Sequence, residues 1–405
     1  MRLSRVPSEL KRSGIRRVME MVWKLEAQGK RVVSLCVGQP DFPAPALAIE
    51  AAQASLANGD TKYISNAGLP SLRDAVAAHY TERASSRSFA AENVLISHGS
   101  MFSFSSAFMA LLEPGDEVLL PDPGFPNYAQ VATLLGAKPV FYPLRLEDGW
   151  QPRVADIDAL RTERTKLAVV CTPGNPTGAV LSASQLQGFA DWSSERRIPV
   201  LSDEIYDRIA FDSGGAAAPT MLATKHEPEL TMIVSGVAKA YAMTGFRVGW
   251  LVAAPELIEL GSKLQEPYLS CGVPFAQAAA EAVLRGPQEG VAAMAAAYER
   301  RRDLAVEILR DFGIFEYAPQ GAFYLLVHCG GDSLAFCDRL LEARRVAVAP
   351  GSAFGDGARE YVRVSLASDD DAIREGLTAL CEFRKEWQVS LLAAKGAEKV
   401  HGGWH

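Results

Sequence analysis

One lysine and one arginine, eight residues apart, lie in a stretch that is otherwise uncharged. Residues 235–250 read Ser-Gly-Val-Ala-Lys-Ala-Tyr-Ala-Met-Thr-Gly-Phe-Arg-Val-Gly-Trp, so Lys239 has small neighbours on both sides. A lysine shielded from water has a lowered pKa and can be present as the free amine, which attacks a carbonyl to make a Schiff base. The donor fork of Arg247 suits a phosphate. The alternative is a buried turn whose two cations pair with ordinary carboxylates.

Other polar side chains follow apolar runs of the sequence. Asp203 and Glu204 end the run 198–201, and Asn175 stands between two prolines in the loop 173–178. A carboxylate at the end of a buried strand is costly unless it meets a positive partner, such as a protonated ring nitrogen. The alternatives are a local cap for Asp203 and simple turn chemistry for Asn175.

A glycine turn offers a candidate anion site. Gly99, Ser100 and Met101 join the apolar run 94–97 to a helical pattern, and amide N–H groups at the start of a helix bind phosphate. Many strand-to-helix turns look like this one, so the turn alone does not identify a phosphate site. The chain has neither a Gly-Lys-Ser/Thr phosphate loop nor a GxGxxG motif, which leaves little support for a nucleotide site.

The elements that must position these residues alternate between strand and helix. Apolar strand-like runs separated by helical patterns predict a large α/β domain over 46–285, with a mostly parallel, seven-stranded sheet covered by helices on both faces. The expected strands are 94–97, 117–120, 138–142, 166–171, 199–202, 231–234 and 248–253. Open sheets of this kind place ligands at the carboxyl ends of their strands.

The remaining segments have a different pattern. A helix near 13–28, a strand near 31–37, a long helix near 288–311 and strands near 322–327, 346–349 and 361–365 predict a smaller α+β domain. We expect it to combine residues 1–45 with 286–392, and we expect 393–405 to form a flexible tail.

Composition excludes several classes of protein. The 405 residues are 48% hydrophobic, carry a net charge of −7 and contain six cysteines without a CxxC pair. No basic stripe indicates a nucleic-acid partner, no apolar run is long enough to span a membrane, and no disulfide scaffold or metal site is expected. We therefore expect a cytoplasmic globular enzyme or binding protein.

Three motifs taken together resemble those of fold type I, class I and II aminotransferases, which depend on pyridoxal phosphate. They are Asn-Pro-Thr-Gly at 175–178, Ser-Asp-Glu-Ile-Tyr at 202–206 and Lys-Ala-Tyr-Ala-Met-Thr-Gly-Phe-Arg-Val-Gly at 239–249, in the family's order and spacing. The similarity extends from residues 37–42 to 361–365. It implies the fold of pyridoxal-phosphate-dependent transferases and a homodimer with shared active sites.

The resemblance also implies roles for individual residues. Lys239 would hold the cofactor aldehyde and move a proton at the substrate Cα, and Asp203 would face the pyridine nitrogen. Asn175 and Tyr206 resemble the pair that hydrogen-bonds the phenolic oxygen, and Phe125 resembles the aromatic residue that stacks on the ring. Lys239, Asp203 and Tyr206 would be the catalytic residues.

Phosphate and substrate contacts follow from the same resemblance. Gly99, Ser100 and Met101 with Arg247 would bind the phosphate, and Tyr63 would reach it from a second subunit. Arg363 resembles the arginine that grips the substrate α-carboxylate, with Gly38 and Asn175 beside that group. Without the resemblance, a surface ion pair on an edge strand would be the better interpretation of Arg363.

The chain departs from the family pattern next to the lysine. Many members have a serine three residues before it and others have one immediately before it, but here these positions are Gly236 and Ala238. One phosphate hydroxyl is therefore expected to be missing. Ser235 could replace it only if the turn were wound differently.

The function implied is transfer of an amino group from an L-amino acid to a 2-oxo acid, with 2-oxoglutarate as the expected acceptor, by a ping-pong mechanism. A C–S lyase or other carbanion chemistry on the same scaffold is one alternative. A regulatory or binding module without turnover is another, which the lack of a basic patch and of room for an added DNA-binding domain disfavours. The identity of the substrate side chain is left open.

Overall fold

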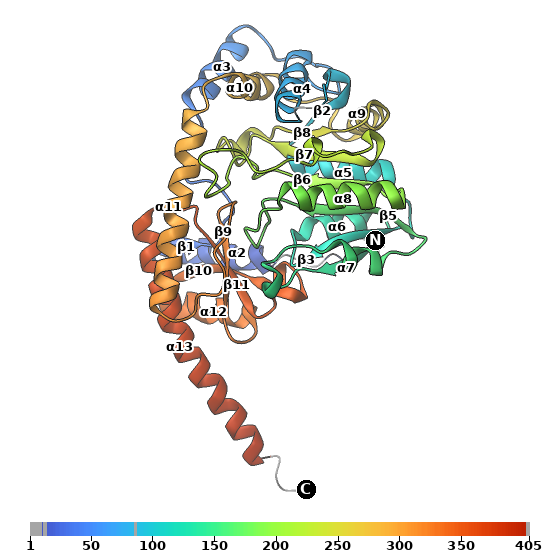
Figure 1. Cartoon of the computed structure of the whole chain (residues 1–405). Coiled ribbons are helices and arrows are strands. Elements are labelled where there is room, and N and C mark those ends of the chain that lie inside the picture. The colour runs from blue at the N-terminus through green and yellow to red at the C-terminus, as the bar shows by residue number, and fades with distance from the viewer. Residues whose placement is uncertain (1–9, 11–13, 85–86, 402–405) are drawn as a thin grey trace, which may run out of the picture. The chain divides into compact units, whose positions relative to one another are not determined.

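The computed structural model describes residues 10, 14–84 and 87–401, which form two compact units (Figure 1). Unit 1 contains residue 10, Gln39–Glu299 and Gln320–Ala322, and unit 2 contains residues 14–38, Arg300–Pro319 and residues 323–401. The sequence placed the boundary near 285, whereas unit 1 extends into the long helix α11 (Glu289–Asp311), which has residues in both units.

Unit 1 is built on the expected seven-stranded, mostly parallel sheet. The strand order is β2-β8-β7-β6-β5-β3-β4. Only β8 runs antiparallel to its neighbours, and the other pairs are parallel. The strands are β2 (Val94–Ser97), β3 (Glu117–Asp122), β4 (Lys138–Pro143), β5 (Thr165–Cys171), β6 (Val200–Asp203), β7 (Thr231–Gly236) and β8 (Gly249–Val252).

Helices cover both faces of this sheet because alternate strand residues enter two hydrophobic clusters (Figure 1). On β5, for example, Leu167 and Val169 enter one cluster and Ala168 and Val170 the other. The first cluster includes residues of α5 (Ser100–Leu111), α6 (Pro126–Leu134) and α9 (Pro255–Leu269). The second includes residues of α3 (Ala46–Ala57), α4 (Pro70–Ala84), α7 (Val154–Leu160), α8 (Ala183–Arg196) and α10 (Pro274–Arg285).

Local signals explain where several of these helices begin. Proline occupies the first position of α6, α9 and α10, where its missing N–H is not needed. Ser182 caps α8 by accepting from the Gln185 amide at 3.2 Å, and the Gln185 side chain accepts from the Ser182 amide at 2.8 Å. Such a Ser-x-x-Gln pattern is typical of a helix start.

Unit 2 is the expected smaller α+β body. Its four-stranded sheet has the order β1-β10-β11-β9, with β1 parallel to β10 and the other pairs antiparallel. The strands are β1 (Val33–Leu35), β9 (Tyr324–His328), β10 (Val346–Pro350) and β11 (Tyr361–Ser365), and the helices are α2 (Gly14–Glu26), α12 (Ser333–Arg344) and α13 (Asp370–His401).

The C-terminal helix is longer than the sequence suggested. Helix α13 continues through residues 393–401, which we expected to belong to a flexible tail, and residues 402–405 of that tail lie outside the described part of the chain. No helix within residues 10, 14–84 and 87–401 has the length and apolar character needed to cross a membrane. All six cysteines are free.

Candidate active site

The carboxyl ends of β6 and β7 bring three of the predicted site residues together. Asp203 ends β6 and pairs with Val234 of the parallel strand β7, and Lys239 follows β7 by three residues. The Lys239 Nζ lies 5.9 Å from the centroid of the Tyr206 ring. The same amine is close enough to Asp203 for its charge to lower the pKa of that carboxyl. A lysine, a carboxylate and a phenol therefore share one end of the sheet.

Asp203 is a buried carboxylate with neutral hydrogen-bond partners. It is 4% exposed. Its Oδ2 accepts a hydrogen bond of 2.5 Å from the Tyr128 hydroxyl, and its Oδ1 accepts from the Ile205 amide at 3.1 Å. Burial raises the pKa of Asp203 to about 6, against the opposing effects of Tyr128, Ile205 and Lys239. Within the described residues Asp203 forms no direct ion pair, so its carboxylate could pair with a bound cation.

Tyr128 is a site residue that the sequence did not single out. It lies in the first turn of α6, is 1% exposed, and packs edge-on against Phe125 and Phe104 with centroid distances of 5.4 and 5.1 Å. A helical pattern can show only that a residue of this kind faces the core. A buried tyrosine needs a partner for its hydroxyl, and that requirement was the available signal. The pattern could not show that the partner is Asp203.

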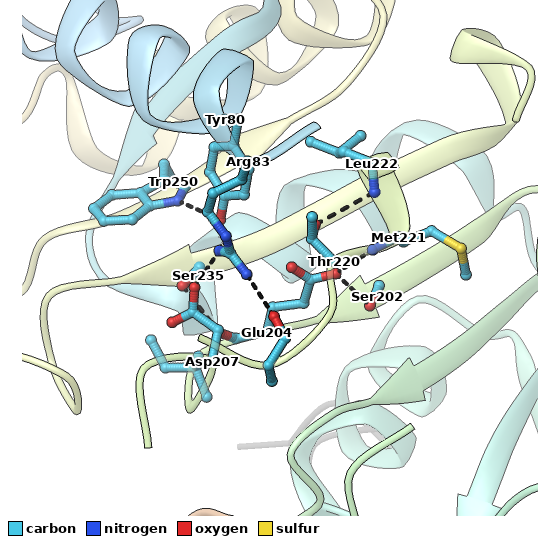
Figure 2. Close-up of polar contacts among 12 residues, drawn as sticks. Tyr80, Arg83, Ser202, Glu204, Asp207, Thr220, Met221, Leu222, Ser235 and Trp250 are labelled. Carbon is cyan, nitrogen blue, oxygen red and sulfur yellow. Dashed lines mark hydrogen bonds and ion pairs between the residues drawn. The ribbon is translucent and has the colours of Figure 1, made fainter. Parts of the chain in front are cut away.

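Glu204, which directly follows Asp203, fixes the turn that carries Asp203 and Tyr206. Figure 2 shows the polar contacts around Glu204. Glu204 is fully buried, and its Oε1 accepts from the Met221 amide at 2.9 Å. Its backbone carbonyl accepts from the Ser235 hydroxyl at 3.2 Å. Burial raises the pKa of Glu204 to about 7. These contacts tie the turn to the 3₁₀ helix η3 (Met221–Ala223) and to β7.

A second group of predicted residues forms an anion cradle at the start of α5. Gly99 has a φ of 77°, a left-handed conformation that favours glycine. The amides of Phe102 and Ser103 donate to the Gly99 carbonyl at 3.0 and 3.3 Å. The amides of Ser100 and Met101 form no hydrogen bond within the part of the chain that the structure describes. Two N–H groups at the positive end of the helix are thus available to an anion.

Arg247 lies directly over this cradle. Its Nη2 is 2.5 Å from the position that a Cβ of Gly99 would occupy. The guanidinium is held by the Thr244 carbonyl at 3.0 Å and the His98 carbonyl at 3.4 Å. A Cβ on Gly249 would stand 2.3 Å from the Ser100 amide nitrogen. The backbone after Lys239 and the Gly99 turn are therefore in close contact, and a side chain at either glycine would separate them.

The departure at Gly236 has a steric cause in this structure. A Cβ on Gly236 would lie 2.7 Å from the Gly249 Cα and 2.8 Å from the Val248 carbonyl oxygen, so a serine does not fit here without movement of β8. The hydroxyl of Ser235 is already bonded to Glu204. The Ser235 hydroxyl is therefore not available to an anion, and the donors of the cradle are the guanidinium of Arg247 and the amides at the start of α5.

Three other predicted residues lie in unit 1. Phe125 is half-buried and immediately precedes α6. Asn175 is 7% exposed in the loop after β5, whose last residue, Cys171, pairs with Asp203. Tyr63 is 88% exposed between α3 and α4. Phe125 is linked to Asp203 through Tyr128, whereas Tyr63 extends into solvent.

Two of the three predicted carboxylate contacts, Arg363 and Gly38, lie in unit 2. Arg363 is 3% exposed on β11, and its Nη2 donates to the Cys36 carbonyl at 2.8 Å. Its Cζ lies 4.2 Å from the Tyr324 ring centroid and 4.7 Å from that of Phe354. A Cβ on Gly38 would lie 2.2 Å from the Tyr324 hydroxyl oxygen. Tyr324 therefore contacts both residues, and the sequence did not single it out.

Known proteins resemble this chain over almost its entire length. The sequence model for the family described as aminotransferase class I and II matches residues 30–380. The aspartate aminotransferase of Pyrococcus horikoshii is 36% identical over 92% of this chain and 94% of its own length. The probable aspartate/prephenate aminotransferase of Aquifex aeolicus is 35% identical over 94% of this chain and 98% of its own length.

A solved structure shows the same arrangement of elements. The crystal structure of aspartate aminotransferase from Thermotoga maritima superimposes with a TM-score of 0.89 and 31% sequence identity, and it covers 94% of this chain and 99% of its own.

Proposed function

The chain belongs to the class I and II aminotransferases, enzymes that depend on pyridoxal phosphate, and on this premise we propose that it holds the cofactor through Lys239. The observation that carries the proposal is the buried carboxylate of Asp203, which accepts a hydrogen bond from Tyr128, is affected by the charge of Lys239 and forms no ion pair within the described residues. A protonated ring nitrogen would neutralise this carboxylate.

The chain's own residues fit the ring of the cofactor. Asp203 would keep the ring nitrogen protonated, Tyr206 and Asn175 would donate to the phenolic oxygen, and Phe125 would stack on the ring face. When bound, pyridoxal phosphate supplies an electron-accepting ring that stabilises negative charge at the substrate Cα. The amine of Lys239 would then remove and return the proton at that carbon.

The cradle at α5 fits the phosphate. The amides of Ser100 and Met101, which have no hydrogen-bond partner among the described residues, belong to the first turn of α5, and Arg247 adds a full positive charge. Tyr63 is exposed, which a residue that reaches the phosphate of a second subunit must be. We therefore propose a homodimer in which the two chains share their active sites.

Arg363 would bind the α-carboxylate of the substrate, with Gly38 and Asn175 beside it. Because an amino acid and a 2-oxo acid have the same carboxylate, one arginine can serve both half-reactions of a ping-pong exchange. We propose 2-oxoglutarate as the amino acceptor. The names of the relatives refer to aspartate and, in one case, to prephenate, which is a 2-oxo acid. Aspartate, with aromatic and aliphatic amino acids, is therefore the donor to examine first, and prephenate is a further acceptor to examine.

A donor screen tests this function. The purified protein with added pyridoxal phosphate is incubated with single L-amino acids and 2-oxoglutarate, and glutamate is measured. We expect glutamate with at least one donor and none with Lys239→Ala. Pyruvate release from cysteine conjugates without glutamate formation would instead favour the C–S lyase. Absence of glutamate with every donor, and of amino transfer to any other 2-oxo acid, would refute the proposal.

A further inference from the structure

We propose that Tyr324 is a positioning residue for the substrate carboxylate: its ring supports Arg363, and its hydroxyl fills the space left by Gly38. The inference rests on the proposed role of Arg363 in the transfer reaction. It concerns residues of unit 2 alone.

The ring of Tyr324 is placed under Arg363 by the register of two strands. Arg363 of β11 pairs with Leu326 of β9, and Tyr324 is two residues from Leu326, so it emerges on the same face of the sheet. Its ring centroid lies 4.2 Å from the guanidinium carbon. Tyr324 is 1% exposed and Arg363 is 3% exposed. Cation–π attraction is strongest for such desolvated pairs.

Two further contacts reduce the freedom of the arginine. The ring of Phe354 lies 4.7 Å from the guanidinium carbon, and the Cys36 carbonyl accepts from Nη2 at 2.8 Å. A long side chain normally loses rotamer freedom when it binds a ligand. Here that ordering is completed on folding, so carboxylate binding has less entropy to lose. The aromatic contacts are thus expected to affect affinity for substrate rather than the chemical step.

The hydroxyl of Tyr324 makes Gly38 a required glycine. The oxygen lies 2.2 Å from the position of a Gly38 Cβ, and the next atom of the same ring, Cζ, is 3.2 Å away. A methyl group at residue 38 cannot coexist with this hydroxyl, but it meets only a tight contact when the oxygen is removed. The two residues should therefore be coupled in a double-mutant cycle.

The proposal is tested by Tyr324→Leu, which removes the ring, with Tyr317→Phe as control. Tyr317 is a tyrosine of the same unit whose buried hydroxyl has no partner among the described residues. We expect Tyr324→Leu to raise KM for donor and acceptor together by about tenfold, the order of a desolvated cation–π contact, with kcat within about threefold. The affinity for propionate, measured by calorimetry, should fall by the same factor as KM rises. Tyr317→Phe should leave KM unchanged.

The hydroxyl is tested by a cycle of Gly38→Ala and Tyr324→Phe. We expect Gly38→Ala to raise KM at least about tenfold more in the natural background than in Tyr324→Phe, a coupling of the size seen for residues in contact. Retention of pyridoxal phosphate should be the same in all four proteins.

The results separate this inference from the function on which it rests. If the natural protein neither transfers amino groups nor binds propionate, the proposed function fails. If it does both, but Tyr324→Leu changes thermal stability without changing KM, or the effects of Gly38→Ala and Tyr324→Phe are additive, Tyr324 is only a packing residue and the inference is wrong.

Discussion

The hydroxyl of Tyr128 donates a 2.5 Å hydrogen bond to the carboxylate of Asp203, and both residues are buried. This bond lowers the pKa of Asp203 against the effect of burial, which raises it. Tyr128 thus helps to keep Asp203 ionised in an environment that favours the neutral acid.

Tyr128→Phe should move the acid limb of the activity profile to higher pH. Without the donated bond the pKa of Asp203 rises further above 6, so more of the protein carries a neutral Asp203 near pH 6. A hydrogen bond to a charged group contributes about 1.5–3 kcal/mol, so we expect a loss of about tenfold or more in kcat/KM at this pH. Tyr142→Phe is the control, because this buried hydroxyl donates to the Val169 carbonyl. A profile for Tyr128→Phe identical to that of the natural enzyme would contradict the role.

Glu204→Gln should stabilise the protein at alkaline pH. The pKa of Glu204 is about 7 in the folded chain and 4.5 in the reference state. The folded state therefore binds more protons between these values, and stability falls as pH rises from about 4.5 to 7. At pH 8 the ionised carboxyl costs on the order of 3 kcal/mol. Urea unfolding should show a gain of about 1–3 kcal/mol for Glu204→Gln at pH 8 that shrinks towards pH 5.

Glu117 offers the opposite case as a control. Its pKa is lowered to about 2, first by the Thr162 hydroxyl and also by Arg164 and Lys138. Its contribution to stability is therefore present above pH 4.5 and lost as pH falls towards 2. Glu117→Gln should destabilise the protein at pH 8. Equal pH slopes for the natural protein and Glu204→Gln would show that Glu204 does not titrate in this range.

Arg247→Ala should weaken retention of pyridoxal phosphate. The cradle has the guanidinium and two amides without partners in the described part of the chain, and neither Gly236 nor Ser235 supplies a hydroxyl. We expect the dissociation constant, measured by fluorescence titration, to rise by about 10–100-fold, and by more than in a relative that has the serines. Arg153→Ala removes an exposed arginine and should have no effect. Unchanged affinity for Arg247→Ala would mean that the phosphate binds elsewhere.

Gly236→Ser should fail to restore the family's hydroxyl. The new Cβ would stand 2.7 Å from the Gly249 Cα, and such overpacking costs about 1–3 kcal/mol. Gly245→Ser is the matched control, since nothing lies within 4 Å of a Cβ there. The temperature of thermal unfolding should fall for Gly236→Ser and stay unchanged for Gly245→Ser. Equal stability of the two variants, with tighter cofactor binding by Gly236→Ser, would show that β8 can move.

The sequence was sufficient to predict those site residues that directly follow a strand. Apolar runs identified the strands, and because parallel strands end at one edge, Asp203 and the lysine after β7 could be expected together. It was insufficient where a contact joins distant segments. Tyr128 bonds Asp203 across 75 residues, and Tyr324 meets Gly38 and Arg363 only after the four strands of unit 2 have paired. Periodicity marks such tyrosines as core and cannot name their partners.

The sequence pattern also could not predict the boundary between the units. Helix α11 is continuous from Glu289 to Asp311 although its residues are divided between the units, so no break in pattern marks the division. The helical residues 393–401 were missed because small and charged residues there resemble a frayed terminus.

Reduction of the cofactor-loaded protein with borohydride, followed by peptide mapping, tests the central claim most directly. If Lys239 holds pyridoxal phosphate, the phosphopyridoxyl group will be found on the peptide that contains Lys239, and Lys239→Arg will remove it. A label on another lysine, or no label on a protein that still transfers amino groups, would contradict the account.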